Sequence, residues 1–238
     1  MSDFAIVTGG AGSIGTAIAE RLTNDGFRVV TVDRDEPRHS FLSDHISLDL
    51  ADATATSETL GAFCRDRRVT RLVNGAGIVR PARFDDTTAE DFDLVQQVNV
   101  RSAMLAAQAA VPSMRRAGIG RIVSISSRAA LGKELRTAYS ASKAALLGMT
   151  KTMALELARD GITVNAIGPG PIWTKLFEAA NPADSPKTKA IVEGVPVGFL
   201  GQPADIAHAV AYFVSDAARF VTGQTLYVCG GMTVGVAR

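Results

Sequence analysis

The sequence predicts an α/β protein with a doubly wound, seven-stranded parallel sheet and helices on both faces of that sheet. Short runs rich in β-branched residues alternate with helical patterns along the chain, and this alternation is typical of parallel strands joined by helices. A glycine-rich segment lies between the first such run and the first helical pattern. The length of 238 residues suits one domain, residues 1–238, with a sizeable core.

The elements follow in a regular order. Helical patterns begin near six positions: Ser13, Asp52, Thr88, Thr137, Thr174 and Pro203. Strands are expected at 4–8, 28–33, 46–50, 71–74, 120–126, 161–168 and 225–230. In such a sheet, ligands bind outside the carboxyl ends of the strands, where the strand order reverses. Polar residues that follow strands are therefore the first candidates for a functional site.

Composition and charge exclude several classes of function. The net charge of +1 argues against nucleic acid or an anionic membrane surface as the main partner. No run reaches the ~18 apolar residues of a membrane helix, and the N-terminus lacks a signal-peptide pattern, so we expect a cytoplasmic protein. The cysteines, Cys64 and Cys229, and the histidines, His39, His45 and His208, show no metal-ligand spacing. We therefore expect free thiols and no metal site.

The glycine-rich segment indicates a dinucleotide. Gly10, Gly12 and Gly15 satisfy the pattern G-x-G-x-x-G between a strand and a helix, which lets backbone amides approach a pyrophosphate at the helix N-terminus. Asp33 closes the second strand 18 residues after Gly15 and can accept hydrogen bonds from the ribose hydroxyls. Its charge would repel a 2′-phosphate, so we expect NAD, with NADP less favoured. Arg34 leaves an alternative open, because its guanidinium could stack on adenine or hold a phosphate.

A second pattern indicates acid–base chemistry. Tyr139 and Lys143 are four positions apart in a helical stretch and therefore share one face of the helix. An ammonium group close to a phenol favours the phenolate, which lowers the pKa of the tyrosine toward the working range of a general acid or base.

These motifs occur in the order that is familiar from one family, and the chain resembles the short-chain dehydrogenase/reductases of the compact, Rossmann-like type. The fingerprints are "TGGAGSIG", "DL" at Asp49 and Leu50, "NGAG" at 74–77, "NV" at Asn99, "ISS" at 125–127, "YSASK" at 139–143 and "PGPIWT" at 169–174. Two positions depart from the family pattern. Ser13 stands where the middle glycine of TGxxxGxG is usual, and Gly75 replaces the second asparagine of NNAG.

The resemblance implies an NAD-dependent oxidoreductase that transfers a hydride between nicotinamide and a secondary alcohol or ketone. It implies Tyr139 as the acid/base, Ser127 as the group that polarises the reacting oxygen, Lys143 as the partner of the tyrosine and the ribose, and Asn99 in a water-linked proton path. The residues that it implies for cofactor binding are Gly9, Gly12, Ser13, Ile14, Gly15, Asp33, Arg34, Asp49, Leu50, Asn74, Ala76, Gly77, Tyr139, Lys143, Pro169, Gly170, Ile172 and Thr174.

The choice of catalytic serine has two solutions. The family's serine is the second of the "ISS" pair, which indicates Ser127, twelve residues before Tyr139. A spacing of thirteen is also familiar and would select Ser126. We favour Ser127, and alternation along the strand places the two hydroxyls on opposite sides.

The segment 174–199, with three prolines, is interpreted as a helical lid over the substrate. Arg80, Arg128, Lys133 and Arg136 are expected near its mouth, where a solvated rim is favoured over a site for an anionic substrate. The resemblance also implies a homo-oligomer, most often a tetramer in this family. An isomerase or dehydratase with the same Tyr and Lys, and a non-catalytic nucleotide sensor, are the alternative functions.

Overall fold

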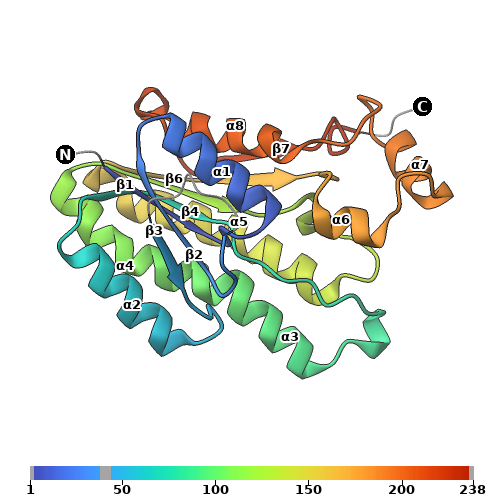
Figure 1. Cartoon of the computed structure of the whole chain (residues 1–238), viewed down its shortest axis with the longest axis horizontal. Helices are drawn as coiled ribbons and strands as arrows, with labels where there is room; N and C mark the ends of the chain where they lie inside the picture. The colour runs from blue at the N-terminus through green and yellow to red at the C-terminus, as the bar shows by residue number, and fades with distance from the viewer. Residues whose placement is uncertain (1–2, 38–43, 236–238) are drawn as a thin grey trace.

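The computed structural model describes residues 3–37 and 44–235, so that His39 lies outside the described residues. One sheet contains seven parallel strands in the order β3-β2-β1-β4-β5-β6-β7. Their bounds are β1 Phe4–Thr8, β2 Arg28–Asp33, β3 Asp44–Ser47, β4 Val69–Asn74, β5 Gly120–Ile125, β6 Ile162–Pro169 and β7 Thr225–Val228. The predicted doubly wound parallel sheet is therefore confirmed (Figure 1).

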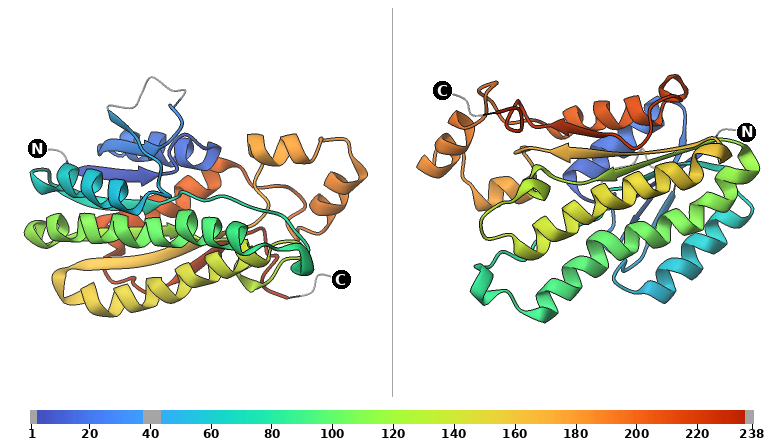
Figure 2. Two further views of the ribbon diagram at one scale, coloured as in Figure 1. Left: turned by 90° about the horizontal axis from the view of Figure 1, so that it is seen from below. Right: turned by 180° about the vertical axis from the view of Figure 1, so that it is seen from behind.

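Helices cover both faces of the sheet. The α-helices are α1 Ser13–Asn24, α2 Ala53–Arg65, α3 Ala89–Gln96, α4 Ser102–Ala117, α5 Thr137–Leu157, α6 Lys175–Ala180, α7 Pro186–Glu193 and α8 Pro203–Val214. Figure 2 shows α2, α4 and α5 along one face of the sheet, with α1 and α8 on the opposite face. Each face has its own apolar core, because strands of a parallel sheet bury both of their sides.

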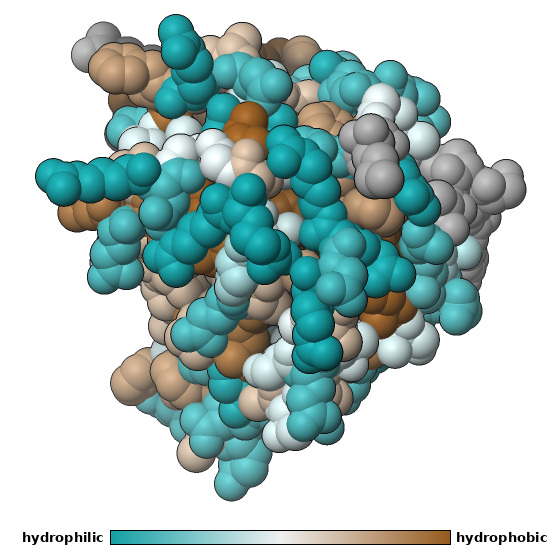
Figure 3. All heavy atoms as spheres, turned by 90° about the vertical axis from the view of Figure 1, so that its left-hand side faces the viewer, coloured by the Kyte–Doolittle hydropathy of each residue, from teal (hydrophilic) through white to brown (hydrophobic). Residues whose placement is uncertain are grey.

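The order of strands reverses between β1 and β4. The glycine-rich segment follows β1 and "NGAG" follows β4, so that the two loops meet at the carboxyl end of the sheet, where such folds bind ligands. Helices α6 and α7 lie at the same end of the molecule (Figure 1). The opposite end of the molecule, at the amino ends of the strands, carries many hydrophilic side chains (Figure 3).

The third strand was predicted at 46–50, and this position is wrong by about two residues, because β3 spans Asp44–Ser47. The cause is a turn at Asp49, whose carboxylate accepts a hydrogen bond from the Ala51 N–H at 2.9 Å. The carbonyl of Asp49 accepts another from the Asp52 N–H. Asp52 then caps α2, so the chain leaves the sheet before Asp49 can pair.

The helix expected from Thr88 begins there, since the Thr88 hydroxyl caps α3. It then widens into a π-helix, Gln97–Arg101, before α4 begins. Such a segment is rare and is found frequently at functional sites. Among the described residues, no helix is both long and apolar enough to cross a bilayer.

Candidate active site

The glycine-rich loop after β1 packs too closely for side chains. Gly9 has a φ of +72°, and a Cβ at this position would lie 2.7 Å from the backbone of Ala76. A Cβ at Gly15 would overlap the carbonyl of Gly9. Glycine is therefore required at both positions if the loop is to approach "NGAG" this closely.

The first turn of α1 offers backbone donors. Gly12 is its N-cap residue and supplies no side-chain cap, so the N–H groups of the first turn remain available to an anion. Ser13 replaces the usual glycine in this turn. Its hydroxyl accepts a hydrogen bond from the Lys175 N–H at 3.4 Å, which connects the loop to the start of α6. Ile14, the next residue in this turn, packs against the apolar core.

Asp33 ends β2 beside this loop. One carboxylate oxygen accepts a hydrogen bond from the Ala11 N–H at 3.1 Å, so Asp33 also holds the glycine-rich loop. Arg34 points into solvent, with 73% of its side chain exposed, and its nearest carboxylate is that of Asp35 at 3.9 Å. Of these two side chains, only that of Asp33 forms a hydrogen bond with the glycine-rich loop.

Thr8 organises the loop after β4, and the sequence interpretation used this residue only to align the motif. Its hydroxyl accepts hydrogen bonds from the N–H groups of Gly75 and Ala76 at 3.1 and 3.3 Å. Asn74 is buried beside it, and neither polar atom of its amide has a partner within the described structure. Buried amides without hydrogen-bond partners are uncommon in folded proteins, and they are found where a polar ligand binds.

Two expected cofactor residues lie farther out. Asp49 and Leu50 follow β3, the edge strand beside β2. Leu50 is buried in the core and Asp49 is exposed. Their place in the fold is near Asp33 rather than near Tyr139.

The tyrosine and the lysine meet as their spacing predicts. Both belong to α5, and the Lys143 Nζ lies 5.6 Å from the centre of the Tyr139 ring. The ammonium group donates a 2.8 Å hydrogen bond to the Ile125 carbonyl at the end of β5. Ser127 follows the same strand, and its hydroxyl is close enough to Tyr139 to lower the pKa of the phenol. A serine, a phenol and a lysine therefore converge at the carboxyl end of the sheet.

Burial decides the electrostatics of this group. Burial raises the pKa of Tyr139 above 10.0, while the Ser127 hydroxyl and the charge of Arg136 act in the opposite direction. Burial lowers the pKa of Lys143 to about 8. The expectation that Lys143 lowers the pKa of Tyr139 is not met here, because burial outweighs the effect of nearby groups and the ammonium is directed at the Ile125 carbonyl.

The two serines have different surroundings. Ser126 is buried, and its hydroxyl donates a 2.7 Å hydrogen bond to the Lys143 carbonyl. Ser127 is half-buried, and its hydroxyl accepts from the Ala129 N–H besides its contact with Tyr139. This geometry favours Ser127 as the residue that reaches a reacting oxygen.

Asn99 lies in the π-helix and is buried. Its Oδ1 accepts from the Ile78 N–H at 2.8 Å, and its Nδ2 donates to the Ile78 carbonyl and to Ser142. A Cβ at Gly77 would come within 3.1 Å of the Lys143 Nζ and 3.4 Å of the Asn99 Oδ1. Asn99 therefore holds the segment after "NGAG" against α5, beside the lysine.

The end of β6 and the loop after it carry the last of the expected cofactor-binding residues. Pro169 ends the strand, and the Gly170 N–H donates to the Val228 carbonyl at 2.9 Å. Thr174 caps α6, because its hydroxyl accepts from the Phe177 N–H. This loop lies at the same end of the sheet as the Tyr139 group.

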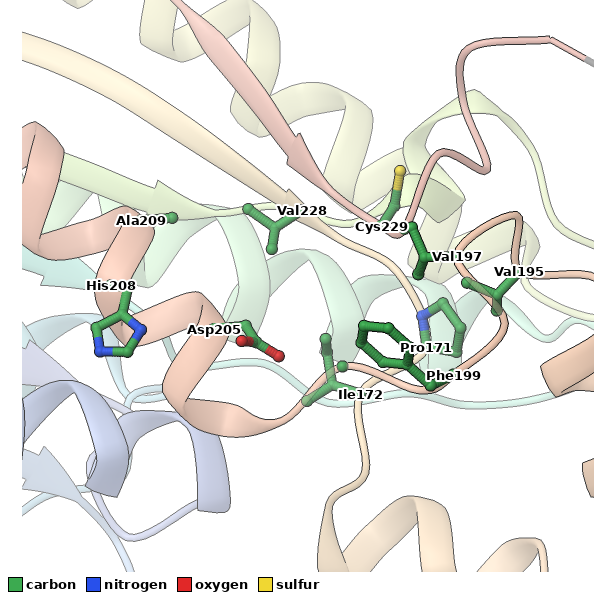
Figure 4. A pocket seen from close by; sticks show the side chains of 12 residues that line it. Pro171, Ile172, Val195, Val197, Phe199, Asp205, His208, Ala209, Val228 and Cys229 are labelled. Carbon is green, nitrogen blue, oxygen red and sulfur yellow. The ribbon is translucent and has the colours of Figure 1, made fainter.

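Ile172 is buried and lines a cavity of about 400 Å³ between this loop and α8. Figure 4 shows the side chains of Val195, Phe199 and Asp205 around that cavity. The lining contains neither Ser127 nor Tyr139, so the cavity is separate from the candidate catalytic group.

The described residues suit a dinucleotide cofactor. They supply a glycine cradle, a helix N-terminus without a side-chain cap, an acidic residue at the end of β2 and a buried amide without a partner. No group of three or more His, Cys, Asp or Glu residues that could hold a metal occurs within 3–37 and 44–235. Cys64 and Cys229 are buried free thiols.

Comparisons with known proteins agree with this geometry. Residues 9–233 match a family model described as enoyl-(acyl carrier protein) reductase. The chain belongs to the short-chain dehydrogenase/reductase family. It is an NAD(P)-dependent oxidoreductase that transfers a hydride between a nicotinamide and a CH–OH or C=O group. The isomerase, dehydratase and sensor alternatives are therefore set aside.

Individual relatives cover nearly the whole chain. The 3-oxoacyl-[acyl-carrier-protein] reductase FabG of Rickettsia felis is 34% identical over 96% of this chain and 95% of its own. L-fucose dehydrogenase of Mus musculus is 36% identical over 98% and 89%. A solved structure from Beutenbergia cavernae, described as an NAD(P)-dependent gluconate 5-dehydrogenase with bound NADP, has a TM-score of 0.92 and 33% identity over 98% of this chain and 97% of its own.

Proposed function

We propose that this enzyme interconverts a secondary alcohol and its ketone with NAD, and that Tyr139 is the general acid/base. The observation that carries the proposal is the convergence of Ser127, Tyr139 and Lys143 at the carboxyl end of the sheet, with the Lys143 Nζ 5.6 Å from the centre of the Tyr139 ring. Tyr139 donates a proton to the carbonyl oxygen during reduction and removes it during oxidation. Ser127 donates a hydrogen bond to the same oxygen and stabilises the charge that develops there.

Lys143 and Asn99 support this step. Lys143 lies on the same face of α5 as Tyr139 and is proposed to bind the ribose hydroxyls of the cofactor. Asn99, which holds Ile78 and Ser142 beside the lysine, is proposed to carry a water-linked path for the proton. The nicotinamide supplies or accepts the hydride, and the protein supplies position and charge.

The cofactor-binding residues are proposed to be those expected from the sequence. The glycine-rich loop and the first turn of α1 would hold the pyrophosphate, and the loop from Pro169 to Thr174 would hold the carboxamide. The preference for NAD rests on Asp33, whose carboxylate would accept from ribose hydroxyls and repel a 2′-phosphate. Solved relatives contain NADP, so the preference needs a direct measurement. A higher kcat/KM for NADPH than for NADH would contradict it.

The segment 174–199 is proposed as a lid within a single domain. It contains α6 and α7, and its start contacts the glycine-rich loop through Ser13. A homo-oligomer, most simply a tetramer, is also proposed. Exposed apolar side chains on α8 and after it, Tyr212 and Phe220, suit such a contact, and light scattering tests it. The cytoplasmic location stays a prediction from the sequence.

Consumption of NADH with a panel of ketones tests the proposed reaction. Neutral methyl ketones of graded length should be reduced, with the alcohol formed in equal amount to NAD. Failure of the folded enzyme to oxidise NADH or NADPH with any carbonyl compound would refute the proposal.

A further inference from the structure

Four cations gather around the loop that precedes the helix of the proposed catalytic tyrosine. Arg128 directly follows Ser127, and Arg136 is the N-cap residue of α5, three positions before Tyr139. Lys133 lies in the loop between them, and Lys187 comes from α7 in the lid segment. Charge interactions link them, because Arg136, Arg128 and Lys187 each act on Lys133, and Arg136 also acts on Tyr139.

No carboxylate neutralises this cluster in the described part of the chain. None of the four cations forms an ion pair there, whereas the nearby Arg80 pairs with Asp91 at 3.3 Å. Arg136 donates only to the backbone carbonyl of Leu135, at 2.8 Å. The charges that act on Lys133 are all positive.

The two arginines of the cluster are less exposed than the side chains of an ordinary solvated rim. Arg128 and Arg136 are half-buried, although guanidinium groups without a partner are normally left in water. The Lys133 residue itself is exposed, but its ammonium group is partly shielded, and this shielding together with the three cations lowers its pKa. Lys187 is exposed as well. Like charges held close together destabilise the fold unless a ligand compensates them.

The loop that carries two of the cations is conformationally strained. Leu135 has a φ of +60°, the only positive φ at a non-glycine residue in the described chain. The loop is held by the Ala82 N–H, which donates to the Leu135 carbonyl at 3.3 Å. A bulky residue in this conformation is a genuine outlier, and such strain is concentrated at active sites and ligand clamps. The strained backbone places Arg136 immediately before the turn that presents Tyr139.

We propose that the substrate carries an anionic group, a carboxylate or a phosphate, and that Arg128, Lys133, Arg136 and Lys187 bind it beside Ser127 and Tyr139. This inference rests on the proposed alcohol and ketone chemistry and adds the substrate class to it. Guanidinium and ammonium groups from η3 (Arg128–Leu131), the loop and α7 would surround the anion. Because Lys187 belongs to the lid segment, the anion would also draw that segment toward the catalytic group.

Matched substrates test the proposal. An oxo-carboxylate is compared with its primary amide, and a phosphorylated hydroxyketone with its unphosphorylated form, at low ionic strength and over several chain lengths. We expect kcat/KM for at least one anionic member to exceed that of its neutral partner by about tenfold or more. The two pairs distinguish a carboxylate site from a phosphate site. Equal rates for the anionic and neutral members of both pairs would overturn the inference but leave the proposed reaction intact.

A variant of the central lysine supplies the specific control. K133Q should lower kcat/KM for the anionic substrate about tenfold and change that for the neutral partner less than twofold. K133R, which keeps the charge, should retain most of the activity with the anion. K189Q removes an exposed lysine of α7 that does not act on Lys133, so it should change neither substrate. Equal losses for anion and neutral partner in K133Q would show a general structural role instead.

Binding can be measured without turnover. Calorimetry with carboxylates and phosphates that lack a carbonyl group reports Kd directly, in the presence of NADH and of NADPH. The wild type should bind one of these classes at least about tenfold more tightly than K133Q, with a Kd that increases with salt. Absence of binding by both classes would refute the anion site. If the anions bind but no ketone is reduced, the proposed reaction fails while the anion site stands.

Discussion

Ser126 and Lys143 are joined by a 2.7 Å hydrogen bond from the serine hydroxyl to the lysine backbone carbonyl. The lysine side chain returns to β5 and donates to the Ile125 carbonyl. These two bonds tie the end of β5 to the second turn of α5. Ser127, the next residue along the chain, is left free to reach Tyr139. Adjacent serines thus have separate tasks, one in holding the helix and one at the proposed site of reaction.

Single alanine substitutions should separate these tasks. S127A should lower kcat about 10²- to 10³-fold, because it removes a donor to the reacting oxygen. S126A should lower the free energy of unfolding by about 1 kcal/mol, because a buried hydrogen bond is lost, and should retain most of kcat. Steady-state kinetics and urea denaturation measure both effects. An inactive S126A beside an active S127A would reverse the assignment.

Removal of the phenol hydroxyl tests the acid/base role. Y139F should lower kcat about 10²- to 10⁴-fold, the range for loss of a general acid or base. The ring remains and continues to pack over Lys143, so cofactor affinity should change little. Fluorescence titration with NADH and single-turnover kinetics separate the two quantities. Normal turnover by Y139F would exclude Tyr139 as the acid/base.

The charge of Asp33 should control the choice of cofactor. D33N keeps an oxygen that can accept from the Ala11 N–H but removes the charge, so the preference for NADH over NADPH should fall about tenfold or more. D35N provides the control, because Asp35 is exposed and faces Arg34 rather than the loop. The kcat/KM values for both cofactors are compared in the wild type and the two variants. An unchanged ratio in D33N would assign the preference to other residues.

Local chemistry predicted much of this fold, whereas contacts between distant residues did not follow from the sequence. Helix starts at Asp52, Thr88 and Thr174 were predictable because each side chain caps its own helix. The end of β3 was missed because the turn at Asp49 competes with a run that reads as a strand.

In the candidate site too, local spacing could be predicted from the sequence, whereas contacts between distant segments could not. The spacing of Tyr139 and Lys143 predicted their contact, since four positions make one helical turn. The direction of the Tyr139 pKa depends on burial by other elements, which spacing cannot reveal. The bond from Ser126 to the Lys143 carbonyl and the hold of Thr8 on the loop after β4 likewise join segments far apart in sequence.

The buried lysine should give folding a measurable dependence on pH. Burial lowers the pKa of Lys143 from 10.5 to about 8, so between these values the unfolded chain binds a proton that the folded chain does not. The free energy of unfolding therefore rises with pH across this window, by about 3 kcal/mol, and this contribution is lost as pH falls from 10.5 to about 8. Below pH 8 both states are protonated, and the contribution is flat.

Substitution of this lysine isolates its contribution. K143M keeps a long apolar side chain without a titrating group, so its free energy of unfolding should lack the rise that the wild type shows between pH 8 and 10.5. Urea denaturation at each pH measures the free energy of unfolding of both proteins. Between pH 8 and 10.5, the value for the wild type should increase by about 3 kcal/mol relative to that for K143M. K189M controls for the loss of one exposed lysine and should follow the wild type. Because other groups titrate alike in all three proteins, parallel curves for wild type and K143M would mean that Lys143 is charged in the folded protein throughout this range. In that case its ammonium would be free to stabilise a Tyr139 phenolate well above pH 8, and the limit on activity at alkaline pH would have to come from another group.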